Sequence, residues 1–139
     1  MILTDTGFWL ALANRRDKHH ERAVARLSEI DEPLVTTLPV MTETCHLLLH
    51  RLGPDSQTAF LASLEAGAFE VFALEPRHAP RIRELMESYR DLPMDLADAS
   101  LVVAAEELGE GRILTTDRRD FGVYRWKGRE GFENVLQAP

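Results

Sequence analysis

Cysteine is nearly absent from this chain of 139 residues, in which Cys45 is the single example. One cysteine cannot form a disulfide within the chain, and it excludes a structural zinc site built from several thiolates. Long apolar runs are also missing, so no segment reaches the roughly 20 residues of a membrane-spanning helix. The first residues lack the basic and apolar regions of a secretion signal. We therefore expect a cytoplasmic protein with no membrane contact.

The formal net charge of the chain is −7, and 45% of its residues are hydrophobic. This length and composition fit one compact domain, which we expect to span residues 1–139. The excess of positive charge that is typical of broad nucleic-acid binding is absent. A cluster of carboxylates can nevertheless make a protein acidic and bind a divalent cation. The positions of the acids therefore matter more than the net charge.

Short apolar runs alternate along the chain with longer amphipathic segments. We expect strands at residues 1–4, 34–37, 69–74 and 112–115, with a fifth near 123–126 or 134–137. Helices are expected at residues 8–13, 17–30, 39–52, 55–66, 78–90 and 96–108. Strands that alternate with helices form a parallel sheet covered on both faces. The expected fold class is α/β, with three layers (α/β/α) around a mostly parallel sheet of four to five strands.

Two aspartates directly follow expected strands. Asp5 comes after the first strand and Asp117 after the fourth. Because ligands of open α/β sheets bind outside the carboxyl ends of the strands, both acids are expected at the edge where a site would form. Either aspartate could instead simply cap the helix that follows it, since Asp is a favoured N-cap residue.

Two further acids lie near the beginnings of helices. Asp98 is in the first turn of the most apolar helix, where an unpaired carboxylate would be penalised by desolvation. Capping by Asp95 and the helix dipole could explain this position locally, although both roles can coexist. Glu43 is near the start of the helix after the second strand and is weak evidence alone. If the four acids converge, a cation must compensate their repulsion, and oxygen ligands favour Mg²⁺ or Mn²⁺, metals suited to phosphodiester hydrolysis.

Four short segments together resemble the PIN-domain ribonucleases, particularly the VapC-like toxins of bacterial type II toxin–antitoxin systems. The segments are 3–6 (LTDT), Thr37 with Glu43 six residues later, 95–99 (DLADA) and 114–121 (LTTDRRDF). Each is short, but their order and spacing cover essentially the whole chain.

The resemblance implies a PIN-like nuclease domain that cleaves RNA with Mg²⁺ or Mn²⁺. The catalytic acids would be Asp5, Glu43, Asp98 and Asp117. Three of them would also be metal ligands, namely Asp5, Asp98 and Asp117. Supporting roles would fall to Thr6, Asp95 and Thr116. The implied partners are an RNA substrate, a cognate antitoxin and a second copy of the chain in a homodimer.

The last third of the chain carries arginines that could contact RNA. We expect phosphate contacts from Arg112, Arg118, Arg119 and Arg125. The alternative is a solvated surface with Trp126 packed beneath it.

Three other functions stay open at this point. A housekeeping RNA-processing nuclease would use the same site. A phosphatase or phosphotransferase would use Asp5 as nucleophile, although no second acid follows two residues later. A non-catalytic module would bind metal and RNA without cleavage. His46 and His50 have the spacing of a zinc-binding helix, but no Glu follows His46, so the metalloprotease pattern is absent.

Overall fold

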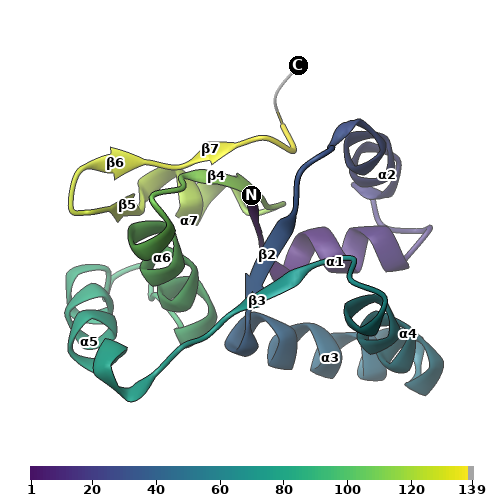
Figure 1. Ribbon diagram of the computed structural model, residues 1–139, viewed down its shortest axis with the longest axis horizontal. Helices are drawn as coiled ribbons and strands as arrows, with labels where there is room; N and C mark the ends of the chain where they lie inside the picture. Colours follow the sequence, from purple (N-terminus) through teal and green to yellow (C-terminus); the bar gives the residue numbers. More distant parts are fainter. Residues whose placement is uncertain (138–139) are drawn as a thin grey trace.

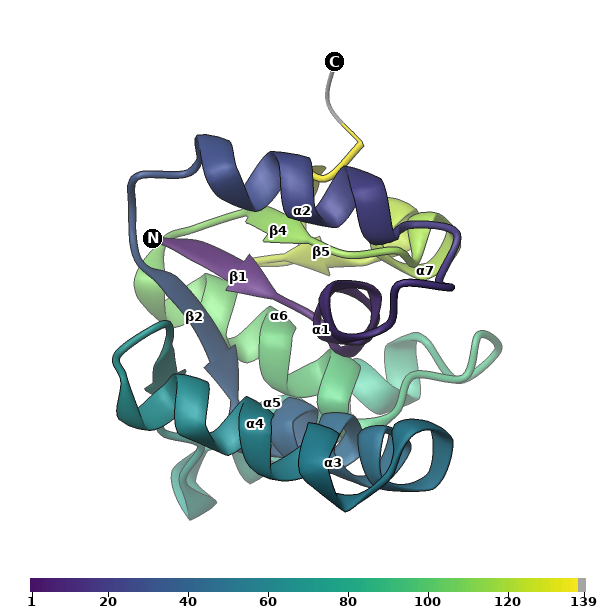
Figure 2. The same ribbon diagram turned by 90° about the vertical axis from the view of Figure 1, so that its right-hand side faces the viewer.

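The centre of the molecule is a parallel sheet of five strands, seen in a computed structural model that describes residues 1–137. The strands are β1 (Ile2–Thr4), β2 (Leu34–Thr37), β3 (Glu70–Phe72), β4 (Arg112–Leu114) and β7 (Glu133–Asn134). Their order is β3-β2-β1-β4-β7, and every neighbouring pair is parallel. β1 therefore lies between β2 and β4 (Figure 2). The predicted α/β fold with a mostly parallel sheet is confirmed.

Helices flank this sheet on both sides. They are α1 (Thr6–Ala13), α2 (His20–Glu29), α3 (Leu38–Leu52), α4 (Pro54–Glu65), α5 (Ala79–Ser88), α6 (Leu96–Leu108) and α7 (Arg118–Val123). A short 3₁₀ helix, η1 (Pro76–His78), precedes α5. In Figure 1, α5 and α6 lie on one side of β1, β2 and β3, and α1, α2 and α4 lie on the other. No helix in the described part of the chain has the length and apolar character needed to cross a membrane.

The apolar sequence of α6 places this helix against the sheet. Eight of its 13 residues are buried, and it packs on α3, α5 and β2. Asp95 caps its first turn by accepting a hydrogen bond from the Asp98 N–H at 2.9 Å, and Gly109 ends it in the left-handed conformation. Because α6 leads into a parallel strand, it runs antiparallel to the sheet and begins at the carboxyl edge of the strands.

An aromatic cluster holds α1 in place on the other side of the sheet. The Trp9 ring lies 5.4 Å from Phe60 and 4.7 Å from Phe69, and the Phe8 ring lies 5.3 Å from Trp9. All four side chains are buried. Their packing fixes the beginning of α1, which immediately follows Asp5, at the same carboxyl edge.

The described structure departs from the predicted elements at two places. Asp17 does not begin α2, since its carboxylate accepts a hydrogen bond from the His19 N–H in a turn at 2.8 Å and the helix begins at His20. Near the C-terminus, α7 was not expected. Of the two places considered for a fifth strand, residues 125–126 form β5 (Arg125–Trp126), which pairs with β6 (Glu130–Gly131) in a separate hairpin, and β7 completes the main sheet.

Candidate active site

Asp5 lies at the end of the central strand and is held by two hydrogen bonds. Its Oδ1 accepts from the Thr6 N–H at 2.8 Å, and its Oδ2 accepts from the Thr115 hydroxyl at 2.9 Å. The residue is only 7% exposed. Burial raises the pKa of Asp5 to about 6, and the charges of Glu43 and Asp117 add to the rise. Asp5 is thus a buried acid with other acids close by.

Asp98 lies in the first turn of α6, and its pKa is raised more than that of Asp5. Its pKa is raised to about 8, mainly by burial and also by the charges of Asp5, Asp95 and Asp117, although a hydrogen bond from Tyr124 opposes the rise. Capping of α6 is done by Asp95. Asp95 therefore caps the helix, and the charges of other carboxylates act on Asp98.

Glu43 and Asp117 complete the acidic group from two further elements. Burial raises the pKa of Glu43, which lies on α3, and the charge of Asp95 adds to the rise, while the nearby Thr6 hydroxyl opposes it. Asp117 caps α7 by accepting a hydrogen bond from the Asp120 N–H at 2.9 Å. Since its charge raises the pKa of both Asp5 and Asp98, it lies within electrostatic reach of them. The structure thus brings all four predicted acids into one electrostatic neighbourhood.

The chemistry of this neighbourhood fits a hard divalent cation. The donors are oxygen atoms alone, which Mg²⁺ and Mn²⁺ prefer, and a cation would compensate the buried charge that raises the pKa of Asp5 and Asp98. Within residues 1–137, no three Asp, Glu, His or Cys side chains form a complete ligand cluster. Mg²⁺ does not require one, because it binds through one or two carboxylates and keeps several waters. The residues that would hold it are Asp5, Asp98 and Asp117.

Among the predicted supporting threonines, Thr6 and Thr116 take different positions. The Thr6 hydroxyl is buried and forms no hydrogen bond of normal geometry within the described residues, but it lies near the Glu43 carboxylate. The Thr116 hydroxyl instead packs against Gly7, where a Cβ atom would lie 2.0 Å from Oγ1. Thr116 therefore supports the site by close packing of its backbone segment on α1.

Two residues that contact the acids were missed in the sequence. The Thr115 hydroxyl donates to Asp5 and also accepts from the Asp117 N–H at 2.9 Å, so it joins two of the acids. Its place two residues before Asp117 at a strand end is the signal that could have identified it. Tyr124 donates to Asp98 Oδ2 at 2.7 Å. No local signal indicates this contact, because the two residues are 26 positions apart.

The four arginines predicted to contact RNA separate into two groups. Arg118 and Arg119 are exposed at the beginning of α7, directly after Asp117. The guanidinium of Arg125 donates to the carbonyl groups of Gly122, Val123 and Tyr124, and so caps the end of α7. Of the four predicted arginines, only Arg118 and Arg119 are both exposed and adjacent to an acid of the site.

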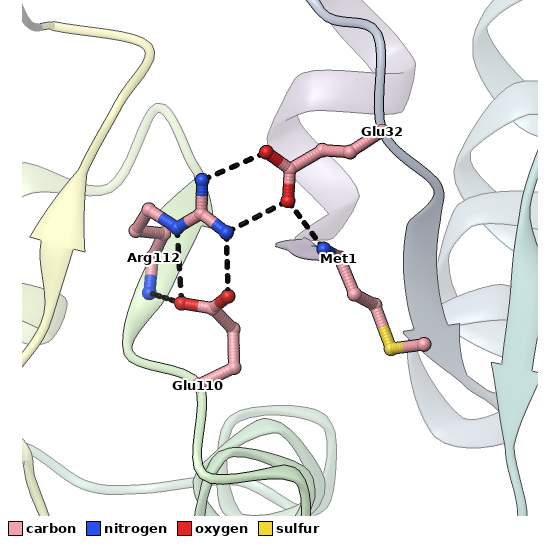
Figure 3. A network of polar contacts seen from close by, with 4 residues as sticks. All are labelled: Met1, Glu32, Glu110 and Arg112. Atoms are coloured by element: carbon pink, nitrogen blue, oxygen red, sulfur yellow. Dashed lines mark hydrogen bonds and ion pairs between the residues drawn. The ribbon is translucent and has the colours of Figure 1, made fainter.

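Arg112 lies at the opposite edge of the sheet from the acids. Its guanidinium donates to Glu32 at 2.7 and 2.9 Å and to Glu110 at 2.7 and 3.1 Å (Figure 3). Glu32 also pairs with the amino group of Met1. These ion pairs strongly raise the pKa of the guanidinium and lower the pKa of Glu32 to about 2. Because Arg112 starts β4 and is occupied by two carboxylates, its predicted contact with RNA finds no support in the structure.

An apolar groove of about 870 Å³ borders the acids. Its apolar walls include Leu38, Val71 and Leu96, which are exposed large hydrophobic side chains. Glu43 and Asp95 line the same groove. The groove therefore joins the acidic group to a surface suited to apolar contacts.

Comparisons with known proteins match this arrangement of strands and helices. The model of the PIN domain family matches residues 2–127. Ribonuclease VapC26 of Mycobacterium tuberculosis is 28% identical over 124 residues, which cover 89% of this chain and 92% of that protein. The crystal structure of VapC20 from the same organism, titled a sarcin–ricin loop cleaving toxin, has a TM-score of 0.79 at 22% identity and covers 86% of this chain and 92% of that chain. This last match shows that the fold is shared.

Proposed function

Because this chain belongs to the PIN-domain family, we propose that it is an endoribonuclease that hydrolyses RNA phosphodiester bonds with the help of Mg²⁺ or Mn²⁺. The observation that carries the proposal is the convergence of Asp5, Glu43, Asp98 and Asp117, with the pKa of Asp5 and of Asp98 raised by burial. The similarity to Ribonuclease VapC26 supports the substrate class. We further propose that residues 1–139 form one nuclease domain.

In the proposed mechanism, each acid has a distinct task. Asp5 and Asp98 would hold the cation, and Asp117 would contact it directly or through water. When bound, a divalent cation would supply the chemistry of water activation and charge neutralisation at the phosphate. Glu43 orients the attacking water and accepts its proton, for which its raised pKa suits it. The water oxygen bonds to phosphorus as the bond from phosphorus to the 3′-oxygen breaks. The 3′-oxygen takes up a proton from solvent, so the products carry a 5′-phosphate and a 3′-hydroxyl.

The phosphatase alternative fits the sequence less well. A nucleophilic Asp5 would be expected with a second acid two residues later, but that position is Gly7. A trapped aspartyl-phosphate would favour that alternative. A non-catalytic module would bind Mn²⁺ and RNA without producing fragments. A housekeeping nuclease would cleave RNA but would have no neutralising partner protein.

We also propose that the chain is the toxin of a type II toxin–antitoxin pair, acts in the cytoplasm on RNA and forms a homodimer. The support for an antitoxin partner is the apolar groove beside Glu43 and Asp95, because a protein segment seated there would cover the acids. The proposed RNA contacts are Arg118 and Arg119, which are exposed beside Asp117.

The deciding experiment is an RNA cleavage assay with Mg²⁺, with Mn²⁺ and with a chelator. The variant Asp98→Asn is expected to lower the cleavage rate by about a hundredfold or more, because it removes a charged metal ligand. Mutation of a residue that only orients a metal ligand already lowers metal affinity or activity by roughly 10–100-fold. The matched control is Asp31→Asn, which neutralises an exposed aspartate just before β2, at the opposite edge of the sheet. Undiminished, metal-dependent cleavage by folded Asp98→Asn protein would refute the assignment.

A further inference from the structure

Tyr124 is a fully buried tyrosine whose hydroxyl reaches the candidate active site. It lies where α7 ends, its side chain is 0% exposed, and the hydroxyl donates to Asp98 Oδ2 at 2.7 Å. Asp117 caps the beginning of the same helix, which starts at Arg118. One helix of six residues thus connects two of the four acids, since it carries Asp117 at its beginning and reaches Asp98 through Tyr124 at its end.

The Tyr124 ring is fixed by other aromatic rings. Tyr89 contacts it edge to face at 5.1 Å, and Phe121 does so at 5.1 Å. The Tyr124 N–H donates to the Asp120 carbonyl at 2.9 Å, which fixes the backbone as well. Because the ring is packed on two sides and excluded from solvent, the hydroxyl cannot turn away from Asp98 without repacking the core.

This contact makes the two oxygens of the Asp98 carboxylate different from each other. Oδ2 accepts from Tyr124, and no further hydrogen bond to this carboxylate is formed in the described part of the chain. Oδ1 therefore has no hydrogen-bond partner among the described residues. A carboxylate with one fixed oxygen loses less freedom when the other oxygen binds a cation, and hydrogen bonds of this kind commonly orient metal ligands.

We propose that Tyr124 is a positioning residue for Asp98, whose Oδ2 it holds so that Oδ1 is presented to the metal ion. The inference rests on the proposed function, because it takes Asp98 as a metal ligand. The alternative role is purely structural, in which the hydrogen bond only satisfies a buried hydroxyl. The two roles differ in what happens to metal affinity when the hydroxyl is removed and the ring is kept.

The test compares Tyr124→Phe with Tyr89→Phe, two substitutions that each remove one hydroxyl from neighbouring rings. The Tyr89 hydroxyl accepts from the Arg125 N–H at 2.9 Å, so it is hydrogen-bonded but has no contact with an acid of the site. Mn²⁺ binding to the whole chain is measured by calorimetry, without RNA. Tyr124→Phe is expected to weaken Mn²⁺ binding by about tenfold or more, and Tyr89→Phe is expected to leave it unchanged. In RNA cleavage, excess Mn²⁺ should restore most of the rate of Tyr124→Phe.

Each other outcome has a defined meaning. Wild-type Mn²⁺ affinity in folded Tyr124→Phe overturns the positioning role, and so does an equal loss in both variants, because that loss would come from packing. If the wild-type chain itself binds no Mn²⁺, the proposed function fails first, and this result is visible without any variant. If Tyr124→Phe does not fold, a crystal structure of the Mn²⁺-loaded wild type decides. A Tyr124 hydroxyl found away from Asp98 there overturns the inference, and one still bonded to Oδ2 with Oδ1 on the metal supports it.

Discussion

Asp98 is buried beside other carboxylates, and this position costs free energy while no cation is bound. Its pKa is about 8 in the folded chain and 3.8 in an ordinary peptide. Between these values the folded state binds more protons than the unfolded state, so the free energy of unfolding falls as the pH rises. Asp5 contributes in the same direction up to about pH 6. The metal-free protein should therefore be more stable in mild acid than at pH 8.

This linkage predicts a stabilising effect of Asp98→Asn. An asparagine carries no charge and still offers an oxygen to the Tyr124 hydroxyl. In the presence of a chelator at pH 8, the substitution should raise the free energy of unfolding by about 1–3 kcal/mol. This value is smaller than the pKa shift alone implies, because Asp98 is partly exposed and solvent screens its charge. Near pH 4 the difference should disappear. Urea denaturation at the two pH values measures it, and a variant less stable than wild type at pH 8 would contradict the electrostatic account.

At this scale the sequence predicted the acids better than their neighbours. Asp5 and Asp117 were found because they follow strands, and Asp98 because a charge is unusual in so apolar a helix. Tyr124 could not be found in this way, because its contact depends on how α7 packs against α6 rather than on any local pattern. The ion pair of Arg112 with Glu32 could not be predicted either, because the two residues are 80 positions apart and meet only when the strands are side by side.

Two short helices, α1 and α7, meet at the site through a very close approach. Gly7 in α1 lies against Thr116, just before α7 begins, and a Cβ atom there would lie 2.0 Å from Oγ1 and 3.2 Å from Cβ of the threonine. Gly122 in α7 has nothing within 4 Å of the corresponding position. The two glycines are thus a matched pair of helical positions, one crowded and one open.

Gly7→Ala and Gly122→Ala should have opposite effects on stability. Alanine is favoured over glycine in helices by up to about 1 kcal/mol, so Gly122→Ala should be neutral or stabilising. Gly7→Ala should instead destabilise the protein by about 1–3 kcal/mol, because the added methyl group forces the segment around Thr116 to shift. It should also lower RNA cleavage, since that segment carries Asp117. Thermal unfolding and the cleavage assay measure both effects, and equal stabilisation of the two variants would exclude the predicted clash.

The elements that sequence patterns identified are those with strong periodicity or long apolar runs. The bounds predicted for α6 and β2 agree with the structure, because burial on most sides leaves a continuous apolar signal. The C-terminal region was harder, since α7 has six residues and β5, β6 and β7 have two each. Such short elements owe their existence to packing against the rest of the molecule, which a local window does not contain.

Charge is distributed unequally over the whole molecule, whose net charge is −7. The carboxyl edge of the sheet carries the four acids, with Arg118 and Arg119 exposed beside them. The amino edge carries Arg112 within its ion pairs (Figure 3). An RNA molecule is repelled at long range by such a chain, so its approach depends on the few cations near the site and on the bound metal.

Reversing the charge of Arg118 and Arg119 together should weaken RNA binding and flatten its dependence on salt. Each lost phosphate contact lowers the slope of log affinity against log salt by about 0.7 for a single strand. The control is Arg112→Ala, which should leave RNA affinity unchanged but lower the melting temperature by a few degrees, because Glu32 and Glu110 lose their partner. Binding titrations at several salt concentrations measure the effect, and an unchanged slope in the double variant would place the RNA elsewhere.

The position of β1 between β2 and β4 has a consequence for a chain still under synthesis. Asp5 is synthesised before Thr115, whose hydroxyl orients it and which lies 110 residues later in the chain. Until β4 has inserted beside β1, a nascent polypeptide contains its early carboxylates without the strand that aligns them. If the proposed function holds, cleavage activity would therefore arise only after β4 has been synthesised and paired with β1.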